Sequence, residues 1–203
     1  MPLRLARFIS FLFHPVFMPT YSLIVLFSLS GYFNFITSTV VKEALFAIIV
    51  FNTLLMPLMI IWLLRKRGYI RSFEMNDPHE RIIPFFCTAI LMFITYYMIL
   101  RLSLPRIFAF LLLGAASSVI IATLITSKWK VSIHMIGIGG LAGMLFGLTE
   151  LFMIDFRFPF MVCLLIAGII GVARLTLQSH KQLQIYTGFL LGFICEYGIL
   201  QIL

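Results

Sequence analysis

Charged residues are scarce in this sequence. Asp, Glu, Lys and Arg make up only 11% of its 203 residues, whereas 62% are hydrophobic and the mean hydropathy is +1.12. A soluble domain needs more polar side chains to cover its surface, so this composition excludes one. Backbone groups in lipid are satisfied only by helices or closed barrels, and the apolar runs are too long for barrel strands. The sequence therefore predicts an all-α polytopic transmembrane helix bundle.

Acidic residues and cysteines are rarer still. Seven Asp and Glu accompany 15 Lys and Arg, which gives a net charge of +8. The basic residues stand mostly at the ends of apolar runs, where they reach lipid headgroups or an anionic ligand, so we expect membrane lipids and no nucleic acid as partners.

Cys87, Cys163 and Cys195 lie inside apolar runs without C-x-x-C spacing. They are predicted to be small core residues, not metal ligands.

Six to seven membrane spans fit into one domain covering residues 1–203, because a helix needs about 20 residues to cross the bilayer. Near the N-terminus, His14, Pro15 and Pro19 interrupt the apolar stretch, and no A-x-A cleavage site follows. We therefore expect this segment to be retained as a basic, interfacial lead into the first span. The predicted spans are residues 17–36, 44–64, 82–101, 106–126, 134–154, 158–175 and 183–203.

Seven spans place the two termini on opposite faces of the membrane. Most of the 15 Lys and Arg residues then lie on the face that carries the N-terminus. The opposite face receives Lys42, Arg101, Arg106 and Arg157. The positive-inside rule favours a cytoplasmic N-terminal face, but the excess is smaller if Arg81, Lys130 and Arg174 are functional, so a site on the outer face stays an alternative. We expect the membrane to be a bacterial inner membrane.

Glycines recur at four-residue intervals in two predicted spans, at Gly139, Gly143 and Gly147 and again at Gly188 and Gly192. Small residues at this spacing allow two helices to approach closely. We therefore interpret these glycines as packing positions.

Three polar segments fall on the N-terminal face, because an even number of spans separates each from the next. They read NDPHERIIP at 76–84, KWKVSIH at 128–134 and ARLTLQSHKQLQ at 173–184. Ionisable side chains buried near lipid are costly, which makes them functional candidates. We expect the three segments to converge on one site.

The spacing within these segments resembles the signatures of the type 2 phosphatidic acid phosphatase (PAP2) superfamily, which read K-x6-R-P, P-S-G-H and S-R-x5-H-x3-D in this order. The chain matches them with E-R-x-x-P through Glu80, Arg81 and Pro84, with S-x-H through Ser132 and His134, and with R-x5-H-x3-Q through Arg174, His180 and Gln184. The resemblance covers about residues 71–192. The stretch FHPVFMPTY near the N-terminus also resembles the start of compact PAP2-like proteins.

This resemblance implies a PAP2-like core that removes phosphate from lipid phosphates or polyprenyl diphosphates without a metal or other cofactor. It implies that His180 is the nucleophile that forms a phosphohistidine and that His134 protonates the leaving alkoxide. Arg174 and Arg81 would bind the phosphate, and Ser132 would hydrogen-bond its oxygens. Arginine forks and paired histidines suit phosphoryl transfer, which needs charge stabilisation and proton transfer near neutral pH.

The chain departs from the signatures at several positions. Glu74 stands where the family has lysine, for which Lys130 is a candidate substitute, and Val131, Ile133 and Ala173 replace proline, glycine and serine. Gln184 replaces the aspartate. Residues four apart share a helix face, so its amide oxygen can still accept the Nδ1 proton of His180, but it supplies no negative charge. The comparable Asp-to-Asn change in a serine-protease triad costs about 10⁴ in rate. The alternative prediction is therefore a weak or inactive PAP2-like protein that binds or transports a phosphorylated lipid.

A straight helix turns by roughly 600° over six residues, so Arg174 and His180 would not share a face. Their cooperation predicts a bend at about 177–179, between the end of one span and the start of the next.

Other assignments stay open. Asp77, His79 and Glu80 are candidate metal ligands without a further partner in the sequence, and NDPHE lacks the second aspartate-rich motif of a prenyltransferase. A small structural subunit of a membrane complex also fits the hydrophobicity. We interpret His14 as structural because it precedes Pro15. Glu196, inside the last span, is expected to form an intramembrane hydrogen bond.

Overall fold

The computed structural model describes residues 1–29, 31–71, 75 and 77–203, and every regular element in this part of the chain is a helix. Glu74 and Asn76, which the sequence patterns include, lie outside the described residues. Seven helical segments are long and apolar enough to cross a membrane, which confirms the predicted all-α transmembrane bundle. They are Leu3–Ser28, Thr39–Lys66, His79–Arg101, Arg106–Thr126, Ile133–Phe152, Arg157–Thr176 and Gln182–Leu200.

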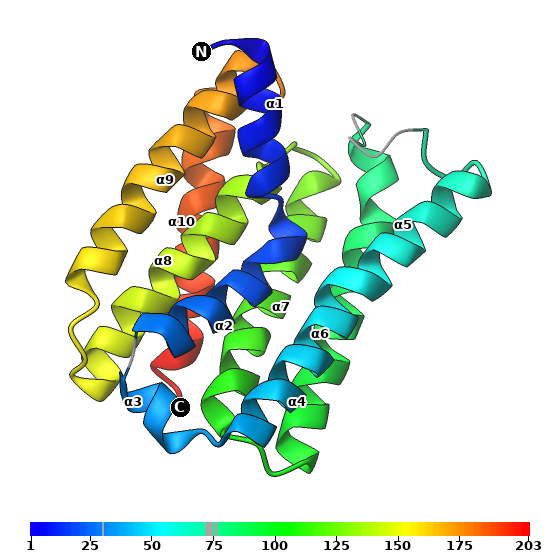
Figure 1. The fold of residues 1–203 in the computed structure, drawn as a ribbon. Helices are drawn as coiled ribbons and strands as arrows, with labels where there is room; N and C mark the ends of the chain where they lie inside the picture. Colours follow the sequence, from blue (N-terminus) through cyan, green and yellow to red (C-terminus); the bar gives the residue numbers. More distant parts are fainter. Residues whose placement is uncertain (30, 72–74, 76) are drawn as a thin grey trace.

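Figure 1 shows these segments as a bundle with the N-terminus at one end and the C-terminus at the other. α8 and α10 pack together, with α9 and α1 on one side and α7 and α6 on the other. The helices are α1 (Leu3–Leu12), α2 (Met18–Leu29), α3 (Gly31–Ile36), α4 (Thr39–Val50), α5 (Met56–Lys66), α6 (Ile82–Arg101), α7 (Arg106–Thr126), α8 (Ile133–Phe152), α9 (Arg157–Thr176) and α10 (Gln182–Leu200). Two 3₁₀ turns, η1 (Pro15–Phe17) and η3 (Pro78–Arg81), precede α2 and α6, and a π-helical turn (Phe51–Leu55) joins α4 to α5.

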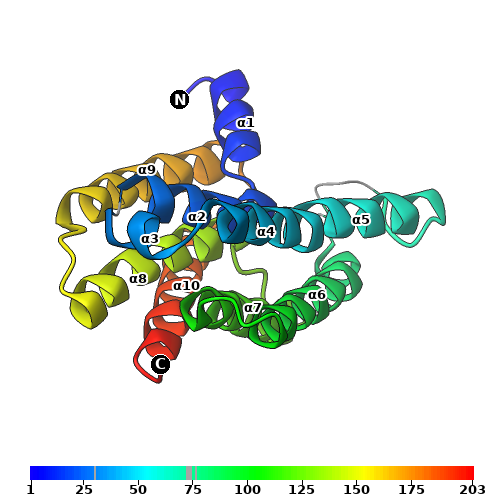
Figure 2. The same ribbon diagram turned by 60° about the horizontal axis from the view of Figure 1, so that its bottom comes forward.

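The predicted first span, 17–36, is wrong at both ends. The apolar segment begins at Leu3, and η1 divides it into α1 and α2, which meet at a steep angle in Figure 2. Pro15 starts η1, where a missing N–H costs little, and the His14 side chain accepts the Val16 N–H over 3.5 Å. α1 packs against α9, so it belongs to the bundle and is more than an interfacial lead.

The predicted bend between Arg174 and His180 is confirmed, because α9 ends at Thr176 and α10 begins at Gln182. The Ser179 N–H donates to the Arg174 carbonyl over 3.2 Å, and the Gln178 N–H donates to the Leu175 carbonyl over 2.9 Å. With Gln178 in the left-handed conformation at φ 51°, this is a Schellman motif that ends α9. The turn leaves His180 directly before Lys181, which is the N-cap residue of α10.

The glycines in α8 and α10 lie at the contact between these two helices, as the packing interpretation predicts. A Cβ atom added at Gly192 would lie 2.0 Å from the Ile136 carbonyl oxygen, and one at Gly139 would lie 2.2 Å from the Phe189 carbonyl oxygen. Real side chains do not fit at such distances. The two backbones are therefore in direct contact, and only glycine allows it.

We expect Gly192→Ala to destabilise the protein by about 2 kcal/mol or more, because the new methyl group meets backbone that cannot move without separating α8 from α10. Gly198→Ala is the matched control in the same helix, since a Cβ there meets nothing within 4 Å. The control should be neutral or stabilising by up to about 1 kcal/mol, as alanine favours helix. Reversible unfolding in mixed micelles measures both, and equal stabilities of the two variants would contradict this prediction.

Candidate functional site

The three polar segments meet where several helices begin or end on the face that carries the N-terminus. Arg81 directly precedes α6, Ser132 precedes α8, and Lys181 precedes α10, while Arg174 lies in the last turn of α9. The start of each helix carries unpaired N–H groups and the positive end of the helix dipole. Three helix starts and several cations near one another favour a bound anion.

His180 lies at the centre of this group and is only 7% exposed. Its Nδ1 atom is 3.3 Å from Gln184 Oε1, which also accepts the Lys181 N–H over 3.0 Å. Because this amide oxygen can only accept, Nδ1 carries the proton and Nε2 carries the lone pair. Nε2 is buried and has no hydrogen-bond partner among the described residues. Gln184 therefore fixes the tautomer in which the unprotonated Nε2 is available within the site.

The surroundings keep His180 neutral. Burial, and after it the charges of Arg174, Arg81 and Lys130, together lower the pKa of His180 to about 3, and the hydrogen bond to Gln184 acts in the opposite direction. These interactions also show that one cation from each polar segment lies near the same imidazole. At neutral pH the site thus contains an uncharged histidine surrounded by positive charge.

The two arginines are fixed by oxygens from other parts of the chain. The buried Arg81 donates from Nε to the Met75 carbonyl oxygen over 2.7 Å, and Arg174 donates from a terminal nitrogen to Ser10 Oγ over 3.3 Å. The Arg174 charge acts on Arg81 as well as on His134. Two guanidinium groups held near each other can offer N–H donors and positive charge to a tetrahedral oxyanion.

His134 belongs to the same group. Its Nε2 lies 3.0 Å from the Ser10 carbonyl oxygen and therefore donates to it, which leaves Nδ1 to hold any transferred proton. Nδ1 is buried and lacks a hydrogen-bond partner within the described part of the chain. His134 and His180 interact electrostatically.

The N-terminal segment contributes two residues that the sequence patterns did not assign to the site. Ser10 bonds both His134 and Arg174, and the ring of His14 packs edge-to-face on His134 at 5.3 Å between centroids. His14 also caps η1, which is the structural role expected for it, and the contact with His134 is a second role. Ser10 contacts residues 124 and 164 positions away, and no local spacing signals such a contact. The stretch FHPVFMPTY was the available hint, because it contains His14.

Ser132 and Lys130 complete the set of predicted residues. Ser132 is fully buried, and its hydroxyl oxygen has no hydrogen-bond partner among the residues that the structure describes. Its backbone N–H donates to the Gln184 carbonyl oxygen over 3.2 Å, which ties the start of α8 directly to the first turn of α10. Lys130 is half-buried and close enough to act on His180.

Two of the three candidate metal ligands, Asp77 and Glu80, have other partners. The Asp77 carboxylate accepts the His79 N–H over 2.9 Å and caps η3, while Glu80 Oε1 lies 3.7 Å from the Arg71 Nε. Within residues 1–29, 31–71, 75 and 77–203, no three His, Cys, Asp or Glu side chains form a group that would hold a metal ion.

The described geometry combines a neutral imidazole with a free lone pair, a second buried imidazole, and cations that can surround a tetrahedral oxyanion. Comparison of the chain with protein-family models, curated proteins and solved structures finds no match. The functional interpretation therefore depends on this geometry and on the residue spacing.

Replacing Arg174 by glutamine should raise the pKa of His180, because it removes the largest of the charges that disfavour the imidazolium. Arg157→Gln, at the start of α9 and so at its opposite end, is the control and should leave that pKa unchanged. Histidine nitrogen NMR of the labelled protein, with the His180 signal assigned by its loss in His180→Ala, measures both. An unchanged His180 titration in Arg174→Gln would show that the two side chains do not interact.

Proposed function

We propose that this protein is a metal-independent phosphatase of lipid phosphates or polyprenyl diphosphates that acts through a phosphohistidine. The observation that supports this proposal most strongly is the state of His180. Its buried Nε2 has an available lone pair, Gln184 holds the ring from the other side, and Arg174, Arg81 and Lys130 surround it with positive charge. A neutral nucleophile among cations suits attack on an anionic phosphorus centre.

In the proposed first step, His180 Nε2 attacks phosphorus, a P–N bond forms and the bond from phosphorus to the leaving oxygen breaks. Arg174, Arg81 and the Ser132 hydroxyl stabilise the equatorial oxygens, where negative charge accumulates. The Nδ1–H of His180 strengthens its hydrogen bond to Gln184 as the ring becomes cationic. Water then attacks the phosphohistidine and restores the neutral imidazole.

His134 supplies the proton for the leaving oxygen. Its Nε2–H is held by the Ser10 carbonyl, so Nδ1 carries the proton that is transferred. The same Nδ1 accepts a proton from the attacking water in the second step, as the reversal of roles requires.

The membrane context favours a lipid substrate. The site lies at the ends of helices that are long enough to cross a membrane, and such ends are expected where lipid headgroups meet the hydrocarbon region. A phosphate attached to a long hydrocarbon chain reaches this level from within the bilayer. We propose a bacterial inner membrane as its location, where the excess of Lys and Arg favours a site on the cytoplasmic face and the outer face is the alternative.

A second function, binding or transport of a phosphorylated lipid without turnover, is favoured by one observation. The partner of His180 is a neutral amide, so the imidazolium that forms during phosphoryl transfer lacks the carboxylate that would stabilise it. The cations that bind phosphate are unaffected by this difference. Such a protein would bind lipid phosphates through Arg174 and release no phosphate.

Purified protein in detergent should release phosphate from phosphatidic acid or undecaprenyl diphosphate in the presence of a chelator, as measured by free phosphate. His180→Ala should reduce the rate at least 100-fold, because the nucleophile is lost. His79→Ala, which removes an exposed histidine near the same face, is the control and should retain full activity. Release that survives His180→Ala unchanged would refute the phosphohistidine mechanism.

Gln184→Asp separates the two functions. If the wild-type protein is an enzyme slowed by its glutamine, a carboxylate at this position should raise the rate by tenfold or more, because it stabilises the cationic ring. If both forms release no phosphate but bind lipid phosphate in an Arg174-dependent manner, the binding function replaces the catalytic one. Phosphate release and retention of radiolabelled phosphatidic acid are measured on the same preparations.

A further inference from the structure

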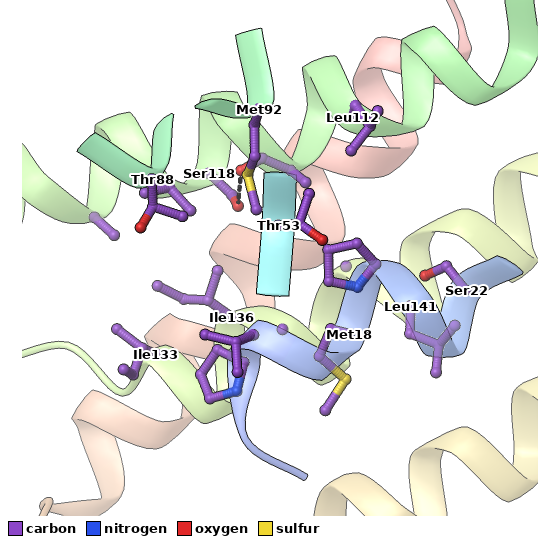
Figure 3. Close-up of a pocket in the computed structure, with 18 of the residues that line it drawn as sticks. Met18, Ser22, Thr53, Thr88, Met92, Leu112, Ser118, Ile133, Ile136 and Leu141 are labelled. Carbon is purple, nitrogen blue, oxygen red and sulfur yellow. Dashed lines mark hydrogen bonds between the residues drawn. The ribbon is translucent and has the colours of Figure 1, made fainter. Parts of the chain in front are cut away.

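A partly open cavity of about 140 Å³ lies between α2, α4, α6, α7, α8 and α10, and the π-helical turn and α5 also line it. Figure 3 shows that aliphatic side chains such as Leu112, Ile136 and Leu141 line most of it, together with Met18 and Met92. Its size is close to that of engineered apolar cavities of about 150 Å³, which admit benzene. A ligand of one ring or a short alkyl chain therefore fits the space.

One carboxyl group interrupts this apolar lining. Glu196 lines the cavity from α10 and is only 6% exposed. A Cβ atom at Gly114 would lie 2.6 Å from Glu196 Oε2, and one at Gly140 would lie 4.0 Å from it, so two glycines provide the room for this carboxyl group. At a rise of 1.5 Å per residue, Glu196 lies about 18 Å along α10 from Gln184, well away from the phosphate site.

The expected intramembrane hydrogen bond of Glu196 is not found. Among the described residues, no side chain or backbone group forms a hydrogen bond or ion pair with its carboxyl group. The described residues that line the cavity also include no Lys or Arg. A carboxyl group without a partner is costly in an apolar environment, and a ligand that carries the missing donor would remove this cost.

Three hydroxyl groups around the cavity already donate their protons within their own helices. Thr53 donates to the Ile49 carbonyl over 2.8 Å, Thr88 to the Pro84 carbonyl over 2.8 Å, and Ser118 to the Ala115 carbonyl over 2.7 Å, the last drawn as a dashed line in Figure 3. Because their protons stay on their own helices, these oxygens can offer a ligand only lone pairs. These three oxygens and the Glu196 carboxyl oxygens are therefore acceptors toward the cavity, which Ser22 and His14 also line.

We propose that this cavity binds a small hydrophobic amine in its ammonium form, with the Glu196 carboxylate as its counter-ion. An ammonium group brings a positive charge and several N–H donors, which match the carboxylate and the hydroxyl lone pairs. Its ring or alkyl chain fills the apolar remainder of the cavity. The proposal does not depend on phosphatase activity, since Glu196 and the three hydroxyl groups lie outside the candidate site, although His14 borders both.

The test compares three probes of similar size, which are benzylammonium, benzyl alcohol and toluene, on the full-length protein in lipid nanodiscs by calorimetry. Benzylammonium should bind at least about tenfold more tightly than benzyl alcohol, because charge-assisted hydrogen bonds are roughly twice as strong as neutral ones. This comparison uses the wild-type protein alone. Equal affinities, or no binding of any probe, would overturn the proposal and leave a cavity that only lipid chains fill.

Glu196→Gln should abolish the preference for benzylammonium while preserving the shape of the cavity. Glu150→Gln is the matched control, since Glu150 is exposed and bonds Tyr197 and Gln201 outside the cavity, and it should keep the preference. Both variants should retain whatever phosphate release or lipid-phosphate binding the wild-type protein has. A preference that persists in Glu196→Gln would refute the role of this carboxyl group even if the phosphate site performs as proposed.

Discussion

The close contact between α8 and α10 is the constraint on which the candidate site depends. Gly139 and Gly192 allow the two backbones to touch, and the hydrogen bond from the Ser132 N–H to the Gln184 carbonyl joins their first turns. This contact fixes Ser132 and His134 on one helix relative to His180 and Gln184 at the start of the other. In lipid, where apolar side chains gain little by leaving their surroundings, backbone contact of this kind is a principal source of helix association.

The neighbouring elements add two arginines to this pair of helices and a serine that holds site residues in place. The Schellman turn after α9 reverses the chain and so positions His180 near Arg174. The 3₁₀ turn η3 places Arg81 directly before α6. α1 then contributes Ser10, whose two oxygens hold His134 and Arg174 together. The result is a buried group of cations and imidazoles at the helix ends, whose N–H donors and positive charge suit an oxyanion.

Polar groups in this bundle thus occur at two depths with different chemistry. The group at the helix ends has an excess of donors and positive charge, which suits phosphate. The cavity around Glu196 has an excess of acceptors, which suits an ammonium group. Both depths follow the same rule, because a polar side chain that hydrocarbon surrounds requires a partner of complementary charge and hydrogen-bonding capacity.

The sequence alone determined features that arise from local spacing. Continuous apolar runs predict the membrane helices, four-residue glycine steps predict the close helix contact, and the six-residue separation of Arg174 and His180 predicts the bend, because helix geometry relates each spacing directly to a face. The convergence of the three polar segments was predictable from the even number of spans between them.

Only the tertiary structure decided which residues from distant segments join these groups. Ser10 and His14 entered the site because the proline break turns α1 onto α9, and the first span was mispredicted for the same reason. Glu196 faces a cavity because Gly114 and Gly140, on two other helices, leave space beside it. Such contacts depend on how whole helices pack against one another, and the periodicity of a single segment does not predict that packing.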